Sequence, residues 1–173
     1  MEETISSTLL HKGKSFSFYN DQVRLPNGHE TQRNIVKHPG AVAIIAVQDN
    51  ELVLIKQFRY ATGKYLLEIP AGTLEPGEDL LGCAVRELQE ETGYAASAWS
   101  KLFQCYMVPG YSNEIIHFFL AEGLSKVEAS PEGDEDIVVN LYGIDEALSM
   151  VEDNEIEDAK TIIGILNYLT RAP

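Results

Sequence analysis

Basic residues are scarce in this sequence. Its 173 residues include 13 Lys and Arg against 27 Asp and Glu, which gives a formal net charge of -14. So negative a chain repels nucleic acids and anionic membrane surfaces, and neither is expected as a partner. A ligand that carries phosphate would therefore need a cation as intermediary. The rest of the composition, 45% hydrophobic and 23% charged, excludes a disordered or fibrous chain.

Long apolar runs and cysteines are also few. The longest aliphatic run, 41–47, suits a buried strand and is far shorter than the roughly 20 residues of a membrane helix. Residues 1–10 are acidic and rich in hydroxyl groups, without the basic start and apolar segment of a signal peptide. Cys83 and Cys105 show no metal-type spacing and are expected to be reduced thiols. We therefore expect a cytoplasmic protein with no membrane span.

The periodicity of apolar residues predicts a sheet-based sandwich with helices packed outside it. An alternating segment over 15–36, with a turn at Pro26, Asn27 and Gly28, predicts a hairpin whose second arm starts near Glu30. Further strands are predicted at 41–47, 52–58, 65–69, 99–107, 115–121 and 137–142. A 3.6-residue period predicts helices at 78–92, 145–151 and 159–169. The acidic segment 128–136 is interpreted as a surface loop.

Three glutamates lie on one face of the first predicted helix. At 100° per residue, Glu87, Glu90 and Glu91 fall within an arc of about 100°. Like charges three or four residues apart destabilise a helix by about 0.2–0.5 kcal/mol per pair. Arg86 can reach Glu90, but one guanidinium does not neutralise three acids. The residues alone leave two interpretations open: a solvated acidic face, or a site for a hard divalent cation such as Mg²⁺ or Mn²⁺.

The surrounding residues have the spacing of a known motif. The segment 72–94 is GTLEPGEDLLGCAVRELQEETGY. Its fixed positions are Gly72, Glu78, Arg86, Glu87, Leu88, Glu90, Glu91 and Gly93. This spacing resembles the signature of the Nudix hydrolases, from which Tyr94 departs because the signature prefers an aliphatic residue there. The resemblance implies an α+β Nudix fold, with a mixed β-sheet sandwiched between helices, and it favours the metal-site interpretation.

By the same resemblance, the protein cleaves a nucleoside diphosphate linked to another group, with Mg²⁺ or Mn²⁺ neutralising the diphosphate and activating water. The implied metal ligands are the carbonyl of Ala71 and the side chains of Glu87, Glu90 and Glu91, and Glu91 is also assigned to the catalytic set. Glu78 and Arg86 match the pair that resembles a structural clamp orienting Glu87.

Outside the motif, the chain resembles the bacterial ADP-ribose pyrophosphatases over nearly its whole length. The similar stretches are RNIVKHPGAVAIIAV, KQFRY, LEIPAG and PGYSNE. Pro109, sixteen residues after Gly93, has a spacing that resembles the marker of ADP-ribose hydrolases. The implied reaction is hydrolysis of ADP-ribose to AMP and ribose 5-phosphate. Arg59 would contact the diphosphate or terminal ribose, and Glu75 and Glu114 match positions that resemble ribose or metal-shell contacts.

The general base of this subfamily resembles a glutamate on an acidic loop downstream of the motif. In this chain that loop is PEGDEDI, residues 131–137. Glu135 is the best match, Glu132 is the second choice and Asp134 the third. A position on a loop suits a base that moves in when the site closes.

We expect two parts, a small N-terminal β-hairpin subdomain over 1–38 and the Nudix hydrolase domain over 39–173. Relatives use such N-terminal strands for pairing across a two-fold axis and for substrate contacts, so a homodimer is expected.

Two alternative functions stay open. Val108 stands where many relatives carry Ser, so another nucleoside diphosphate sugar, such as GDP-mannose or ADP-glucose, is an alternative substrate. The alternative of a different class is a non-catalytic nucleotide-sensing module. The complete set of Arg86, Glu87, Glu90 and Glu91 argues against it, because a pure binder does not need a full metal cluster.

Overall fold

A computed structural model of the protein describes residues 1–128 and 136–171. The strands are β1 (Glu3–Lys12), β2 (Ser17–Arg24), β3 (Glu30–Lys37), β4 (Ala41–Gln48), β5 (Glu51–Arg59), β6 (Lys64–Glu68), β7 (Ala71–Thr73), β8 (Tyr94–Tyr106), β9 (Ile115–Lys126) and β10 (Ile137–Gly143). The helices are α1 (Leu80–Thr92), α2 (Ile144–Glu152) and α3 (Ala159–Leu169). Within the described residues, β1-β2-β3 form one sheet, and a second has the order β10-β5-β4-β9-β8, with β6 beside β5 and β7 beside β4.

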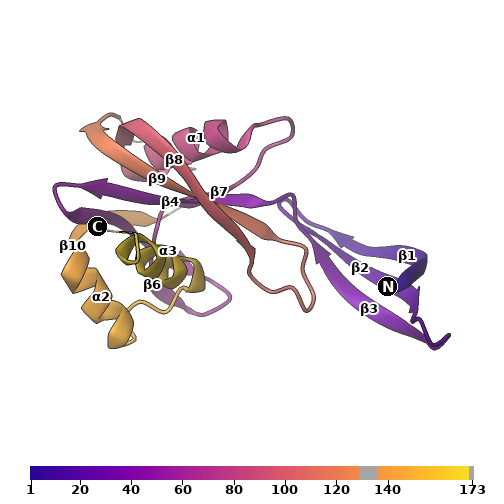
Figure 1. Ribbon diagram of the computed structural model, residues 1–173. Helices are drawn as coiled ribbons and strands as arrows, with labels where there is room; N and C mark the ends of the chain where they lie inside the picture. Colours follow the sequence, from indigo (N-terminus) through magenta and orange to yellow (C-terminus); the bar gives the residue numbers. More distant parts are fainter. Residues whose placement is uncertain (129–135, 172–173) are drawn as a thin grey trace.

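The larger sheet is mixed, because β4 runs parallel to β9 whereas β5 pairs antiparallel with β10 and β6. Figure 1 shows α1 on one side of this sheet and α2 with α3 on the other. The predicted α+β class, with a mixed sheet between helices, is therefore confirmed. No helix in the described part of the chain is both long enough and apolar enough to cross a bilayer.

Strand β4 shows why both faces of the sheet are covered. Its residues 41–47 are all buried, as the continuous apolar sequence predicts for a strand with no solvated face. Ala43 and Ile45 belong to the apolar cluster that includes residues of α2 and α3. Val42 and Ile44 belong to a second cluster that includes Leu88 of α1. The two-residue period of a strand thus builds two cores.

Strands β4 and β5, both predicted, form a hairpin that is paired at its turn and opens beyond it. Asp49 and Asn50 have positive φ, 50° and 67°, the conformation of a tight hairpin turn. Direct pairing of the two strands stops after Val47 with Leu52. Beyond that point, β4 pairs with β7 and β9, while β5 pairs with β6 and β10. This divergence lets β7, the segment just before α1, join the sheet beside β4.

Helix α1 is confirmed, with a start two residues later than predicted. Asp79 is its N-cap and accepts hydrogen bonds from the backbone N–H groups of Leu81 and Gly82, both at 3.0 Å. Glu78 therefore lies in the loop before the helix. Gly93 ends the helix with φ of 67°, the left-handed conformation that glycine adopts without strain.

Helix α3 lies close against the sheet. A Cβ on Gly164 would meet Ile69 Cδ1 at 3.0 Å and Ile45 Cγ1 at 3.4 Å, so the missing side chain permits this approach. Asp158 caps the helix by accepting a hydrogen bond from the Thr161 N–H at 2.9 Å. Thr161 Oγ1 in turn accepts one from the Ile69 N–H at 2.8 Å. The first turn of α3 is thus fixed to the segment that follows β6.

The N-terminal hairpin predicted over 15–36 is confirmed as β2 and β3, with β3 starting at Glu30, and β1 adds a third strand that was not predicted. β1 has two register shifts, between Thr4 and Ser6 and between Leu9 and His11, and these break the alternation by which strands are recognised. Figure 1 shows the three-stranded sheet projecting from the rest of the protein. Its last strand is attached to the loop 107–114 through the Val36 N–H, which donates to the Tyr111 carbonyl at 2.8 Å.

Candidate active site

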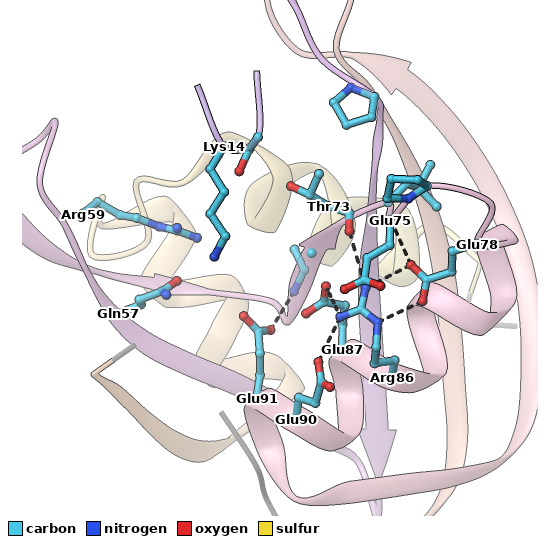
Figure 2. A pocket seen from close by; sticks show the side chains of 16 residues that line it. Lys14, Gln57, Arg59, Thr73, Glu75, Glu78, Arg86, Glu87, Glu90 and Glu91 are labelled. Atoms are coloured by element: carbon cyan, nitrogen blue, oxygen red, sulfur yellow. Dashed lines mark hydrogen bonds and ion pairs between the residues drawn. The ribbon is translucent and has the colours of Figure 1, made fainter. Parts of the chain in front are cut away.

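One cavity of about 910 Å³ lies where α1, β5, β7 and the loop between β1 and β2 meet. Its lining residues are Lys14, Ser15, Pro39, Gln57, Arg59, Ala71, Gly72, Thr73, Leu74, Glu75, Pro76, Glu78, Arg86, Glu87, Glu90 and Glu91. Figure 2 shows the labelled side chains of this set. The cavity therefore contains Arg59 and most of the fixed residues of the sequence motif.

Arg86 is the hub of the acidic side of the cavity. Its guanidinium donates to both carboxylate oxygens of Glu78, from Nε at 2.9 Å and from Nη2 at 3.0 Å. Nη1 donates to Glu87 at 2.8 Å and to Glu90 at 2.9 Å. These hydrogen bonds, above all those to Glu78, raise the pKa of Arg86. One cation thus contacts three carboxylates, and the local charge stays negative.

Glu78 links the loop before α1 to the helix. Hydrogen bonds from Arg86 lower the pKa of Glu78 to about 2, so this carboxylate is ionised at neutral pH. The same carboxylate accepts a hydrogen bond from the Glu75 N–H at 3.1 Å. Arg86 Nη2 also donates to the Thr73 carbonyl at 3.4 Å. The loop over 73–78 is therefore held against the face of α1 that carries the glutamates.

Gly72 lies directly under the carboxylate of Glu87. A Cβ at residue 72 would lie 1.8 Å from the carboxyl carbon of Glu87, so a side chain there would displace that carboxylate. Glu91, one turn further along α1, is 5% exposed and accepts a hydrogen bond from the Ala71 N–H at 2.9 Å. Residues 71–72 and the two glutamates therefore lie in direct contact, although the chain places them about 15 residues or more apart.

The chemistry of the lining suits a hard divalent cation. Five carboxylates face three basic side chains, and the donors are oxygens, which Mg²⁺ and Mn²⁺ prefer. Among residues 1–128 and 136–171, however, no three His, Cys, Asp or Glu side chains converge as a ready-made metal cluster. Glu87 and Glu90 instead share Nη1 of Arg86. The residues fit such an ion in charge and donor type, with Arg86 as the counter-ion of two of the expected ligands.

Arg59 reaches the cavity from the end of β5. It donates from Nε to Glu68 Oε1 at 2.7 Å and from Nη2 to Glu68 Oε2 at 2.6 Å. These bonds raise the pKa of Arg59, as do the charges of Glu91 and Asp158. Its side chain is 41% exposed, so one end of the guanidinium is fixed and the other faces the cavity. The end of the guanidinium that faces the cavity can donate hydrogen bonds to an anion such as a diphosphate.

The remaining predicted site residues are divided between several places. Glu75 lines the cavity. Glu114 does not; it lies in the loop after β8, with Oε1 at 3.8 Å from Nδ1 of His38. Glu132 and Glu135, the two expected bases, lie outside the described residues.

Sequence reasoning missed four polar residues of the cavity, which are Lys14, Ser15, Gln57 and Thr73. Gln57, which is 7% exposed, precedes Arg59 by two positions on β5, and strand periodicity alone would have placed both side chains on the same face. Lys14 lies in the loop between β1 and β2. No signal in the sequence marks it, because β1 itself lacks a strand pattern.

Cys83 is buried beside Arg86, whose Nη2 lies 3.5 Å from its sulfur. Burial raises the pKa of the Cys83 thiol to about 12, with the charge of Glu78 adding to the effect. The thiol therefore stays protonated and unreactive at neutral pH. Both Cys83 and Cys105 are free in the structure, as expected.

Comparisons with known proteins agree with this geometry. Residues 36–163 match the NUDIX domain family. The chain is 46% identical over 167 residues to an ADP-ribose pyrophosphatase of Bacillus subtilis (strain 168), which spans 95% of this chain and 90% of that protein. It is 42% identical over 169 residues to an ADP-ribose pyrophosphatase of Mycobacterium tuberculosis, at 95% and 81% coverage.

Two further similarities bear on the substrate and the fold. A GDP-mannose pyrophosphatase of Citrobacter koseri is 40% identical over 140 residues, or 75% of this chain and 72% of that protein. A crystal structure of an ADP compounds hydrolase superposes with a TM-score of 0.86 at 20% identity, over 98% of this chain and 92% of that one. At so low an identity, the second similarity supports the fold alone.

Proposed function

This chain belongs to the Nudix hydrolase family, and from that premise we propose that it hydrolyses ADP-ribose to AMP and ribose 5-phosphate. The observation that carries the proposal is that one cavity is lined both by Glu87, Glu90 and Glu91 of α1 and by Arg59 at the end of β5. A diphosphate is an anion, so it needs a basic side chain to bind it and a further cation to balance the charge of the three glutamates. The 46% identity to an ADP-ribose pyrophosphatase over 95% of the chain supports the choice of nucleotide.

Nudix hydrolases generally depend on divalent metal ions. We assign the ion here to Mg²⁺ or Mn²⁺ and its ligands to the Ala71 carbonyl and to Glu87, Glu90 and Glu91. When bound, such an ion neutralises the diphosphate and lowers the pKa of water. Glu78 and Arg86 orient Glu87, while Gly72 leaves the room that Glu87 occupies.

The other residues bind substrate and move a proton. Arg59 donates charge-assisted hydrogen bonds to the diphosphate, and Glu75 contacts a ribose at the rim of the cavity. We keep Glu114 as a proposed substrate contact, outside the cavity of the isolated chain. Glu135 takes the proton from the attacking water, with Glu132 as the second choice. Water adds across the P–O–P bond, so one phosphoryl group gains its oxygen and the other leaves with the bridging oxygen.

We also propose that the protein is a cytoplasmic homodimer that pairs through its N-terminal sheet, residues 1–38. β1 is an edge strand on which Ile5, Leu9 and Leu10 are exposed. Exposed apolar side chains on a free sheet edge are normally covered by a partner.

A substrate panel tests the proposed reaction. Release of AMP is measured from ADP-ribose and ADP-glucose, and GMP from GDP-mannose, with Mg²⁺, with Mn²⁺ and after complete chelation with EDTA. We expect ADP-ribose to have the largest kcat/KM, by about tenfold or more, and chelation to abolish turnover. The Glu87→Gln variant, prepared in the same way, controls for contaminating hydrolases.

Each other outcome favours a specific alternative. A larger kcat/KM on GDP-mannose would support the second candidate, which Val108 and the 40% identity to a GDP-mannose pyrophosphatase favour. Tight binding of ADP-ribose without turnover would support a sensing module. Turnover that survives chelation would contradict the metal requirement.

The same assay identifies the base. Glu135→Gln is expected to lower kcat by about 10² or more, because general base catalysis is lost. Glu132→Gln and Asp134→Asn are the matched comparisons on the same loop. Near-normal turnover of Glu135→Gln would transfer the role to whichever of the other two is impaired.

A further inference from the structure

Glu68, at the end of β6, is a buried carboxylate to which the proposed reaction assigns no role. It is 1% exposed, and an unpaired charge at such a position would strongly destabilise the fold. Burial alone would raise the pKa of Glu68, but hydrogen bonds from Arg59 and the charge of Lys160 outweigh burial and lower it. The carboxylate is therefore ionised and satisfied by two cations.

The first of these cations is the cavity residue Arg59. Its Nε and Nη2 engage the two oxygens of Glu68, at 2.7 Å and 2.6 Å. A bidentate pair fixes the plane of a guanidinium as well as its place, which a single hydrogen bond does not do. The buried carboxylate thus sets the direction in which the half-exposed Arg59 side chain faces the cavity.

The second cation comes from α3, which contributes nothing to the cavity lining. Lys160 is 8% exposed and donates from Nζ to Glu68 Oε2 and, at 3.0 Å, to Asp158 Oδ2. Asp158 also accepts from the Thr161 N–H and, at 2.6 Å, from Thr161 Oγ1. Lys160 is therefore immobilised by the N-terminal cap of its own helix.

Together the four charged side chains form a neutral group, two carboxylates with two cations. Without Lys160, the Glu68 carboxylate would lose one of its two cationic hydrogen-bond partners and would be held by Arg59 alone. Without Glu68, Arg59 would retain its charge but no longer its orientation. Oriented donors bind an anion better than mobile ones, because less side-chain freedom is lost on binding.

We propose that Glu68 and Lys160 are positioning residues that hold Arg59 in the orientation in which it binds the substrate's diphosphate. The inference rests on the proposed function, since it assumes that Arg59 binds a diphosphate. It links the last helix of the chain to the active site through one carboxylate. Neither residue touches the substrate.

A double-mutant cycle on kcat/KM for ADP-ribose tests this inference. Glu68→Gln preserves the size of the side chain and removes its charge. In the wild-type background it is expected to lower kcat/KM about tenfold, mainly through KM, because a charged hydrogen bond to the substrate is misdirected. In the Arg59→Ala background the same change is expected to have little further effect, because the group that it positions is absent.

Lys160→Met provides a second variant that keeps an unbranched side chain without charge. It is expected to lower kcat/KM less than Glu68→Gln does, and again only while Arg59 is present. Lys64→Met is the matched control. Lys64 pairs with Glu157 on the surface between β6 and α3, with both side chains about half exposed, and is expected to leave kcat/KM unchanged. The Tm of every variant is measured by thermal unfolding, and assays are run well below each Tm. Loss of folding is thereby separated from loss of the orientation of Arg59.

A purely structural role of Glu68 predicts equal losses in both backgrounds, and that result would overturn the inference. The cycle is repeated on the Kd of ADP, measured by calorimetry, which needs no turnover. If wild-type enzyme does not cleave ADP-ribose, the proposed substrate fails, and the ADP cycle still decides the inference. Failure of wild-type protein to bind ADP would overturn it as well.

Discussion

The N-terminal sheet and the larger sheet differ in how much of each is buried and in which interactions stabilise them. Among residues 1–38, Val23 alone is buried, whereas 41–47 of β4 are buried throughout. The small sheet is supported by backbone pairing and by surface ion pairs such as Arg24 with Glu30 and Arg33 with Glu2. Exposed ion pairs of this kind contribute about 0–1 kcal/mol each. Folding stability is therefore concentrated in the larger sheet and the helices packed on it.

The largest effect expected from this comparison is on stability. Leu54→Ala in β5 removes a fully buried side chain and is expected to lower the free energy of unfolding by about 2–5 kcal/mol. Leu10→Ala in β1 removes a side chain that is 54% exposed and is expected to change it by about 0.5 kcal/mol or less in the monomer. Urea unfolding measures both. Equal losses would show that the small sheet has a core of its own.

The next effect concerns activity. Glu87→Gln in α1 is expected to lower kcat/KM for ADP-ribose by about 10²-fold or more, since a charged ligand of the proposed metal ion is lost. Tm should change little, because Glu87 is one of three carboxylates that share Arg86. Glu152→Gln, at the exposed end of α2, is the matched control. Parallel losses of Tm and activity in Glu87→Gln would assign the residue to stability instead.

A smaller effect is expected on association. Ile5→Asp places a charge on the exposed edge strand β1, at a residue that the register of β1 with β2 skips. The change should raise the dissociation constant of the proposed dimer about tenfold or more and leave the monomer folded. Sedimentation at several concentrations measures the constant. An unchanged dimer would move its interface away from β1.

The smallest expected effect is a dependence on pH. The pKa of Glu78 is lowered from 4.5 to about 2 by hydrogen bonds from Arg86. Its contribution to stability is complete above pH 4.5 and is lost as the pH falls from there toward 2. With allowance for solvent around the pair, we expect about 1 kcal/mol. The difference in unfolding free energy between wild type and Glu78→Gln should therefore shrink between pH 5 and pH 3. A constant difference would contradict the ion pair.

Local sequence patterns were sufficient to predict the elements whose residues follow a regular period or form one apolar run. The apolar run 41–47 predicted a buried strand. The 3.6-residue period predicted helix α1, which is capped by Asp79 at its start and by Gly93 at its end. The spacing of the glutamates predicted a shared helix face. Such features depend on neighbours within a few turns, so the sequence carries them directly.

Contacts between distant segments were not predicted. β1 escaped detection because its bulges break the strand period, and Lys14 escaped with it. The bidentate ion pair between Arg59 and Glu68 joins β5 to β6. The second cation that contacts Glu68 is Lys160 of α3, 92 residues further along the chain. Nothing in the sequence around residue 68 indicates that partner.

The sequence by itself therefore determined most of the elements, with β1 among the exceptions, and placed the acidic cluster on one helix face, because periodicity and spacing are properties of a chain segment. Helix spacing and the family resemblance had already paired Arg86 with Glu90 and Glu78. The tertiary structure alone decided that Glu68 joins Arg59 to Lys160. The physical reason is that a buried charge is stable only beside its counter-charge, and packing of the sheet and helices determines which one lies within reach.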